Sequence, residues 1–91
     1  MPTQILAVGT AAADSADVVV ASGSSLTVCL KDAAGPNVLG GSGVDILLKD
    51  DAGQYFKVDG LDNMKPAVVI NGAGTYRFSR RVGSSCGVFS A

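Results

Sequence analysis

The chain has 91 residues, of which 47% are hydrophobic and 16% charged, and a formal net charge of -1, values that fit one small globular domain. It contains no His, so it lacks the commonest general base and transition-metal ligand, which excludes most hydrolase and zinc chemistry. Seven Lys and Arg against eight Asp give no basic field for a nucleic-acid backbone, and no apolar run is long enough to span a membrane. We therefore expect neither nucleic acid nor a membrane as a partner.

Short runs in which apolar and polar residues alternate, separated by Gly, Asn, Asp and Pro, predict half-buried β-strands along the whole chain. The predicted strands cover residues 4–8, 17–21, 26–31, 44–49, 54–58, 67–70 and 74–80, with a last apolar pair at Val88 and Phe89. Residues 9–14 are interpreted as a connection with one helical turn, and residues 33–43 as a long loop. The predicted fold class is all-β, a single antiparallel β-sandwich or small barrel of about seven or eight strands over residues 1–91.

Turn residues predict how neighbouring strands are joined. The turn at residues 50–53 makes residues 44–49 and 54–58 a hairpin, and a second turn is expected at Asp59 and Gly60. Asn71-Gly72 is the strongest hairpin dipeptide in the chain and predicts a second hairpin. The alternation also predicts inward-facing residues on two strands, namely Leu26, Val28 and Leu30 on one and Val44, Ile46 and Leu48 on the other.

Two Gly-rich segments have the outline of catalytic or binding motifs. Residues 83–87 satisfy G-x-S-x-G, but a nucleophile elbow needs a strand–turn–helix and a His, so we interpret the segment as a turn. Cys86 likewise has no His that could activate it as a nucleophile, so it is interpreted as a structural thiol. Residues 35–42 have Gly41 where a phosphate-binding loop needs Lys, and are interpreted as a connection. We predict no catalytic residue and no cofactor.

The acidic and sulfur-containing residues give no metal site. The four aspartates nearest one another in sequence flank a single strand and are interpreted as solvated turn residues: Asp50, Asp51, Asp59 and Asp62. Cys29 and Cys86 could form one disulfide by count. The first residues have neither the basic region nor the long apolar region of a signal peptide, which indicates a cytosolic protein with free thiols.

Three of the seven cations lie within five residues, at Arg77, Arg80 and Arg81. In an alternating strand, Arg77 and Arg81 share a face with Ser79, whereas Arg80 lies on the opposite face with Tyr76 and Phe78. Such a group fits an anionic partner, and the alternative is charge that protects a sheet from unwanted pairing. The predicted partner-contact residues are Arg77, Arg80, Arg81 and Tyr55.

Several segments of the chain are similar to one class of protein. They are residues 47–55, the run from Pro66 to Phe78 that contains Gly74-Thr75-Tyr76-Arg77, and the Cys86-Gly87-Val88-Phe89 ending. In these segments the chain resembles the small β-rich virion proteins of tailed bacteriophages, of the head-associated or capsid decoration type. The resemblance covers the C-terminal half, whereas the first third matches nothing specific. Its role as a docking arm, over residues 1–15, or as a swapped strand is left open.

The resemblance implies a non-enzymatic structural protein that is assembled in the host cytoplasm, resides in the virion, and binds the major capsid protein or other virion proteins. A head–tail connector or tail-ring subunit is an alternative, and a carbohydrate-binding adhesion module is a further one. The core must be thin, because only 5% of the residues are aromatic, so association would add useful burial. We therefore expect a homo-oligomer, a trimer or a dimer.

Overall fold

The structure of the chain is a computed structural model that describes residues 2–33 and 35–91. The described part contains nine β-strands: β1 (Thr3–Gly9), β2 (Ala13–Asp14), β3 (Val18–Val20), β4 (Leu26–Lys31), β5 (Gly43–Lys49), β6 (Tyr55–Asp62), β7 (Ala67–Ile70), β8 (Gly74–Arg80) and β9 (Cys86–Ser90). None of the elements in these ranges is a helix long and apolar enough to cross a membrane.

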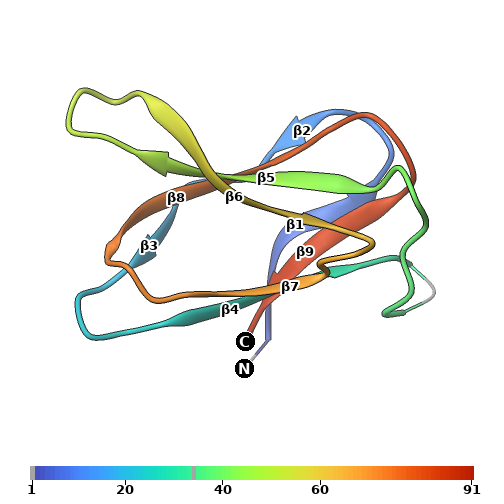
Figure 1. Cartoon of the computed structure of the whole chain (residues 1–91), viewed down its shortest axis with the longest axis horizontal. Helices are drawn as coiled ribbons and strands as arrows, with labels where there is room; N and C mark the ends of the chain where they lie inside the picture. The colour runs from blue at the N-terminus through green and yellow to red at the C-terminus, as the bar shows by residue number, and fades with distance from the viewer. Residues whose placement is uncertain (1, 34) are drawn as a thin grey trace.

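The strands form two antiparallel sheets that pack as the layers of a β-sandwich (Figure 1). The four-stranded sheet has the order β1-β9-β4-β7, and the five-stranded sheet has the order β2-β8-β5-β6, with β3 also paired to β8. In Figure 1 the five-stranded sheet, with β5 and β8, forms the upper layer, and β4 and β7 of the four-stranded sheet lie in the lower layer. The predicted all-β sandwich is confirmed.

The core lies between the sheets and consists mostly of aliphatic side chains. Val28, Val44, Ile46, Phe78 and Val88 have no solvent-exposed surface at all. The strand alternation explains this burial, because every second residue of each central strand points toward the opposite sheet. The predicted inward-facing sets are confirmed, with the residues nearest the sandwich rim, Leu26 and Leu48, partly buried against the core.

The hairpin predicted at Asn71-Gly72 is wrong. β7 pairs with β4 in one sheet, and β8 pairs with β3 and β5 in the other, so residues 71–73 carry the chain from one layer to the other. The Tyr76 hydroxyl donates a hydrogen bond of 2.8 Å to the Gly72 carbonyl and holds this crossing in place. The dipeptide correctly marks a change of direction, but tertiary pairing decides which strands become neighbours.

Two further local predictions are wrong for physical reasons that the structure shows. Asp59 and Gly60 do not form a turn but continue β6, where they lie opposite Ile46 and Asp45 respectively. The register between β5 and β6 shifts next to this pair, between Ile46 and Leu47. Residues 9–14 contain no helical turn, because the chain bends at residues 10–11 and then pairs with β8 as β2. By contrast, the predicted hairpin of residues 44–49 and 54–58 is confirmed as β5 and β6.

Candidate partner-contact site

The three arginines at the end of β8 lie in different environments, as the alternation predicts. Arg77 is partly exposed on the outer face of the five-stranded sheet, and Arg81 follows the strand and is exposed. Arg80 is only 7% exposed and lies on the inward face with Tyr76 and Phe78. The sequence therefore groups three residues that the fold divides between two faces.

The buried guanidinium of Arg80 binds backbone carbonyls. Its Nε donates to the Ala11 carbonyl at 2.7 Å, and its Nη1 donates to the carbonyls of Ala7 and Cys86 at 2.6 and 2.9 Å. These bonds tie β8 to β1, to the chain that follows β1 and to the start of β9. Gly9 leaves room for the guanidinium beside it. Arg80 thus has a structural role inside the fold, and we do not carry it into the contact site.

Arg77 and Tyr55 meet at a carboxylate that the sequence reasoning missed. The Asp17 cluster consists of Asp17, Lys49, Tyr55 and Arg77. The Tyr55 hydroxyl donates to Asp17 at 3.0 Å, Arg77 Nε donates to the same carboxylate at 3.1 Å, and Lys49 Nζ lies 3.5 Å from it. Arg77 also stacks on the Tyr55 ring, with its Cζ 4.1 Å from the ring centroid.

The Asp17 cluster changes the titration of its carboxylate. Partial desolvation raises the pKa of Asp17, but hydrogen bonds from Tyr55 and Arg77 and the charges of Arg77 and Lys49 outweigh it, so the pKa lies below its ordinary value. Asp17 is therefore ionised at neutral pH, and it orients both cations and the tyrosine ring. The register of β5 and β6 places Lys49 directly opposite Tyr55, which explains why these residues converge.

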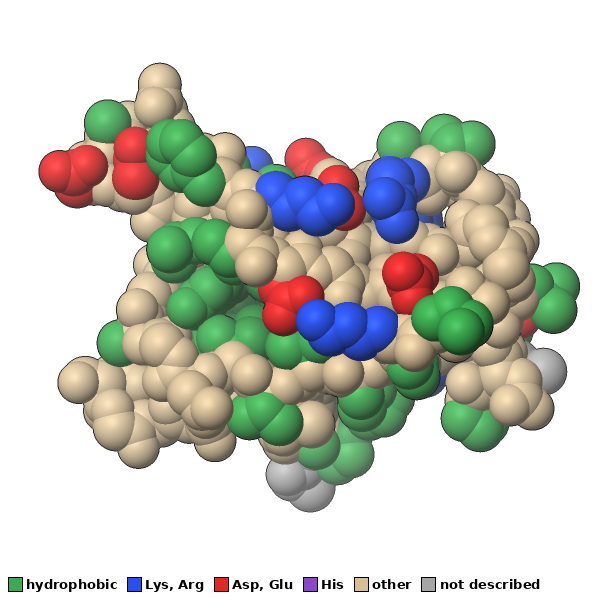
Figure 2. Space-filling model, in the orientation of Figure 1, with side chains coloured by type: hydrophobic (Ala, Val, Ile, Leu, Met, Phe, Trp, Pro, Cys, Tyr) green, Lys and Arg blue, Asp and Glu red, His purple; other side chains and the backbone are tan. Residues whose placement is uncertain are grey.

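A second cluster lies on the same outer face. The Asp45 cluster consists of Asp45, Lys57 and Arg81, with Lys57 Nζ and Arg81 Nη1 at 3.4 and 3.6 Å from Asp45 Oδ1. This oxygen is shielded from water and has no hydrogen-bond partner among the described residues, so the two cations hold it by charge. Figure 2 shows Lys and Arg side chains over β5 and β6 with carboxylates beside them.

We call the Asp17 and Asp45 clusters together the charged face. Each cluster sets two cations against one carboxylate. Asp14 lies at the margin, where it accepts a hydrogen bond of 2.6 Å from the Ser79 hydroxyl. Even with Asp14 included, the charged face has more cations than carboxylates, whereas the whole chain has a net charge of -1. The positive charge is thus concentrated on one side of the sandwich.

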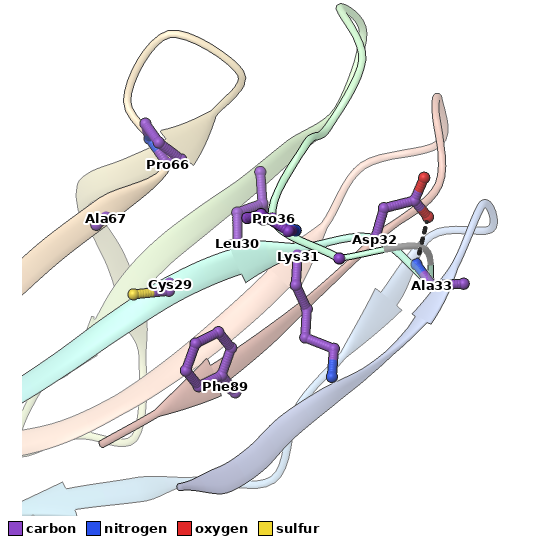
Figure 3. A pocket seen from close by; sticks show the side chains of 10 residues that line it. Cys29, Leu30, Lys31, Asp32, Ala33, Pro36, Pro66, Ala67 and Phe89 are labelled. Atoms are coloured by element: carbon purple, nitrogen blue, oxygen red, sulfur yellow. Dashed lines mark hydrogen bonds between the residues drawn. The ribbon is translucent and has the colours of Figure 1, made fainter.

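The outer face of the four-stranded sheet is different in kind. It contains an apolar groove of about 460 Å³, shown in Figure 3, whose lining residues include Cys29, Lys31, Pro36, Pro66, Ala67 and Phe89. Cys29, Ala67 and Phe89 come from the neighbouring strands β4, β7 and β9. The Lys31 ammonium lies 5.9 Å from the Phe89 ring centroid and has no carboxylate within ion-pair distance in residues 2–33 and 35–91.

The two Gly-rich segments pack against each other, which explains their composition. The Ser84 hydroxyl donates to the Gly40 carbonyl at 2.6 Å, and a Cβ at Gly83 would lie 2.3 Å from the Gly41 carbonyl oxygen. The Ser85 hydroxyl donates to Asp32, which lowers the pKa of that carboxyl. The motif at residues 83–87 is therefore a structural bend that leads into the first residues of β9.

The remaining acidic residues and the thiols serve local contacts. Asp59 accepts hydrogen bonds from Lys65 Nζ at 2.7 Å and from the Gly60 N–H at 2.8 Å, and both lower its pKa. No group of three potential ligands that could hold a metal ion occurs in the part of the chain that the structure describes. Cys29 is half-buried, Cys86 is buried, and both thiols are free.

Comparison with known proteins gives a result at the level of the fold. No family model matches the chain, and no curated protein matches its sequence. Its structure is similar to the crystal structure of the SPBc2 prophage-derived protein YomS, with a TM-score of 0.72 and 12% sequence identity over 99% of this chain and 88% of that one. The chain therefore has the overall fold of that prophage-derived protein along nearly its whole length.

Proposed function

We propose that this chain is a non-enzymatic structural protein of a bacteriophage particle, which binds the capsid surface as a decoration protein and self-associates there. The observation that supports it most is the fold shared with the prophage-derived YomS, at a TM-score of 0.72 over 99% of the chain. The residue patterns of the C-terminal half, which resemble small virion proteins, point independently in the same direction. In this proposal the protein is assembled in the host cytoplasm and resides in the virion.

The charged face is the surface that we assign to the capsid. Its excess of cations suits an acidic surface, because complementary charge raises the association rate and disfavours wrong partners. Tyr55 and Arg77 are held in place by Asp17 before any partner arrives, so little side-chain freedom is lost on binding. Aromatic and Arg side chains are also enriched at the energetic centres of protein interfaces. We assign the contact to Tyr55, Arg77 and Arg81.

The charged face also bears on the carbohydrate-binding alternative. Sugar sites present open aromatic rings, and the Tyr55 ring is covered on one side by Arg77 at 4.1 Å. The chain has no Trp and only two Tyr. The arrangement favours a protein partner over a sugar.

The proposal is tested by co-sedimentation with purified particles that lack this protein. Wild-type chain is expected to bind, and the Arg77→Ala, Arg81→Ala double variant to bind at least about tenfold more weakly, with binding that falls as salt increases. The matched control is Lys31→Ala with Lys65→Ala, which removes the same charge outside the charged face. Equal loss in both double variants would show that only the net charge matters.

Particle composition gives a second test. Mass spectrometry of particles from the phage that encodes the chain is expected to detect it in stoichiometric amounts on the head. Absence of the chain from purified particles would overturn the proposal. Location at the neck or tail, with rings of the purified chain visible by negative-stain microscopy, would favour the connector or tail-ring alternative.

A further inference from the structure

β7 is an edge strand that has neither a charged residue nor a bulge. Natural edges are blunted by bulges, charges or extreme shortness. Among the other edge strands, β1 has two register shifts, β6 has one register shift and carries Lys57, and β2 and β3 are two and three residues long. β7 (Ala67–Ile70) pairs with β4 in continuous register and contains only apolar residues.

The hydrogen-bond pattern shows which groups of β7 remain open. The Leu30 N–H donates to the Pro66 carbonyl at 2.7 Å, which makes Leu30 and Pro66 a hydrogen-bonded pair. Hydrogen-bonded and non-hydrogen-bonded pairs alternate along an antiparallel ladder. Val68 therefore also directs its N–H and C=O toward β4, whereas Ala67 and Val69 direct theirs away from the sheet. In the described part of the chain, β7 has no strand on that side.

We propose that a second copy of the chain pairs with β7 through its own β7, antiparallel and about a two-fold axis. The register follows from the open groups. When Val68 of one copy faces Val68 of the other, Ala67 faces Val69 in both directions, and these two pairs exchange about four main-chain hydrogen bonds. The two four-stranded sheets then become one continuous sheet.

The charges around β7 fit a second copy. In this register Lys65 lies opposite Asn71 of the other copy, so no like charges meet across the pair. The Lys65 ammonium is already neutralised by Asp59 within its own chain. Val69 is 53% exposed, and pairing covers part of its side chain. A two-fold interface is self-complementary and closes after two copies, which limits the assembly to a dimer at this edge.

The inference rests on the self-association included in the proposed function, but it is tested without a particle. Four-residue strands bury less surface than a standard interface, so we expect a weak dimer. Sedimentation velocity from low micromolar to millimolar protein is expected to show monomer and dimer in exchange. A chain that remains monomeric across this range would overturn the inference. The capsid-binding proposal would not be affected by that result, because co-sedimentation with particles tests it separately.

Val69→Lys is the first variant, because it places a charge on the exposed side of β7. It is expected to weaken dimerisation at least about tenfold. Val58→Lys is the matched control, since Val58 is 52% exposed on β6, the edge strand of the other sheet, and it should leave dimerisation unchanged. Circular dichroism checks that both variants are folded. Equal dimerisation in Val69→Lys and wild type would contradict the pairing.

Cysteine cross-linking tests the register and does not depend on the Lys variants. In a Cys29→Ala background, Val68→Cys places two thiols on the two-fold axis, where the Cα atoms of a non-hydrogen-bonded pair lie about 4.5 Å apart, within disulfide range. Mild oxidation is expected to give a covalent dimer. Val69→Cys faces Ala67 and should cross-link far less. Cross-linking that is equal at both positions, or stronger at residue 69, would overturn the register.

Discussion

The two outer faces of the sandwich expose different kinds of side chain to water. On the five-stranded sheet, long cationic side chains gather around Asp17 and Asp45, and these two carboxylates partly neutralise their charges. On the four-stranded sheet, small residues such as Cys29 and Ala67 leave a groove next to Phe89. One face is covered by its own side chains, and the other is left hollow and apolar.

The difference shows how one thin domain can carry two kinds of contact. Charged side chains already held by neighbours suit an acidic protein surface, because they lose little freedom on binding. The apolar groove extends onto β7, and a dimer through β7 would place two grooves on one continuous sheet. Three substitutions test this comparison, beginning with Arg80 on the inward side of β8.

The largest effect is expected for Arg80→Met. Loss of the guanidinium leaves the carbonyls of Ala7, Ala11 and Cys86 without their donor, so the free energy of unfolding should fall by about 3 kcal/mol. Arg77→Met is the matched control on the charged face, where a partly exposed ion pair contributes less than about 1 kcal/mol. Urea unfolding of both variants measures the difference. Equal losses would mean that the division of β8 into a structural side and a contact side is wrong.

An intermediate effect is expected for Phe89→Ala. Phe89 is half-buried on the apolar face, so removal of its ring should lower the free energy of unfolding by about 1–2 kcal/mol, less than for a fully buried Phe. Phe56→Ala on β6 is the control, because that ring is 53% exposed and should cost less than about 1 kcal/mol. Thermal unfolding of the two variants gives the order. The reverse order would contradict the packing of Phe89 against the sheet.

The smallest effect is expected for Asp17→Asn and appears in the pH dependence of stability. Because the pKa of Asp17 is lowered in the folded protein, its ionised form contributes stability above the unfolded pKa of about 3.9. This contribution is lost as the pH falls through the folded pKa. Asp17→Asn should therefore flatten the acid side of the stability profile and leave the neutral and alkaline profile parallel to wild type. An unchanged acid slope would show that the cluster does not hold the carboxylate.

The sequence predicts strands better than it predicts their partners. β4, β7 and β8 begin and end at the predicted residues, because alternation and flanking turn residues are local signals. The crossing at residues 71–73 is not local, since it depends on whether β8 gains more by pairing with β5 than with β7. A turn dipeptide contains no information about that competition.

The contact site was predictable in part for the same reason. Tyr55, Arg77 and Arg81 stand out as aromatic or clustered cationic residues, and alternation correctly separates Arg80 from its neighbours. Asp17 lies 60 residues before Arg77, and only the pairing of β3 with β8 brings the two together. The groove was missed because its lining comes from strands and loops far apart in sequence, and only the pairing of β4 with β7 and β9 brings them together.

The pairing of β1 with β9 has a consequence for how the protein is made. Thr3 lies opposite Ser90, so β1 finds its partner only in β9, the last strand of this fold. The four-stranded sheet can close only after β9 has been made, and its closure brings together the strands most distant in sequence. Until then β1 has no hydrogen-bonded neighbour in its sheet. The four-stranded sheet, with the β7 edge available for pairing, is therefore complete only once the last strand of the fold is in place.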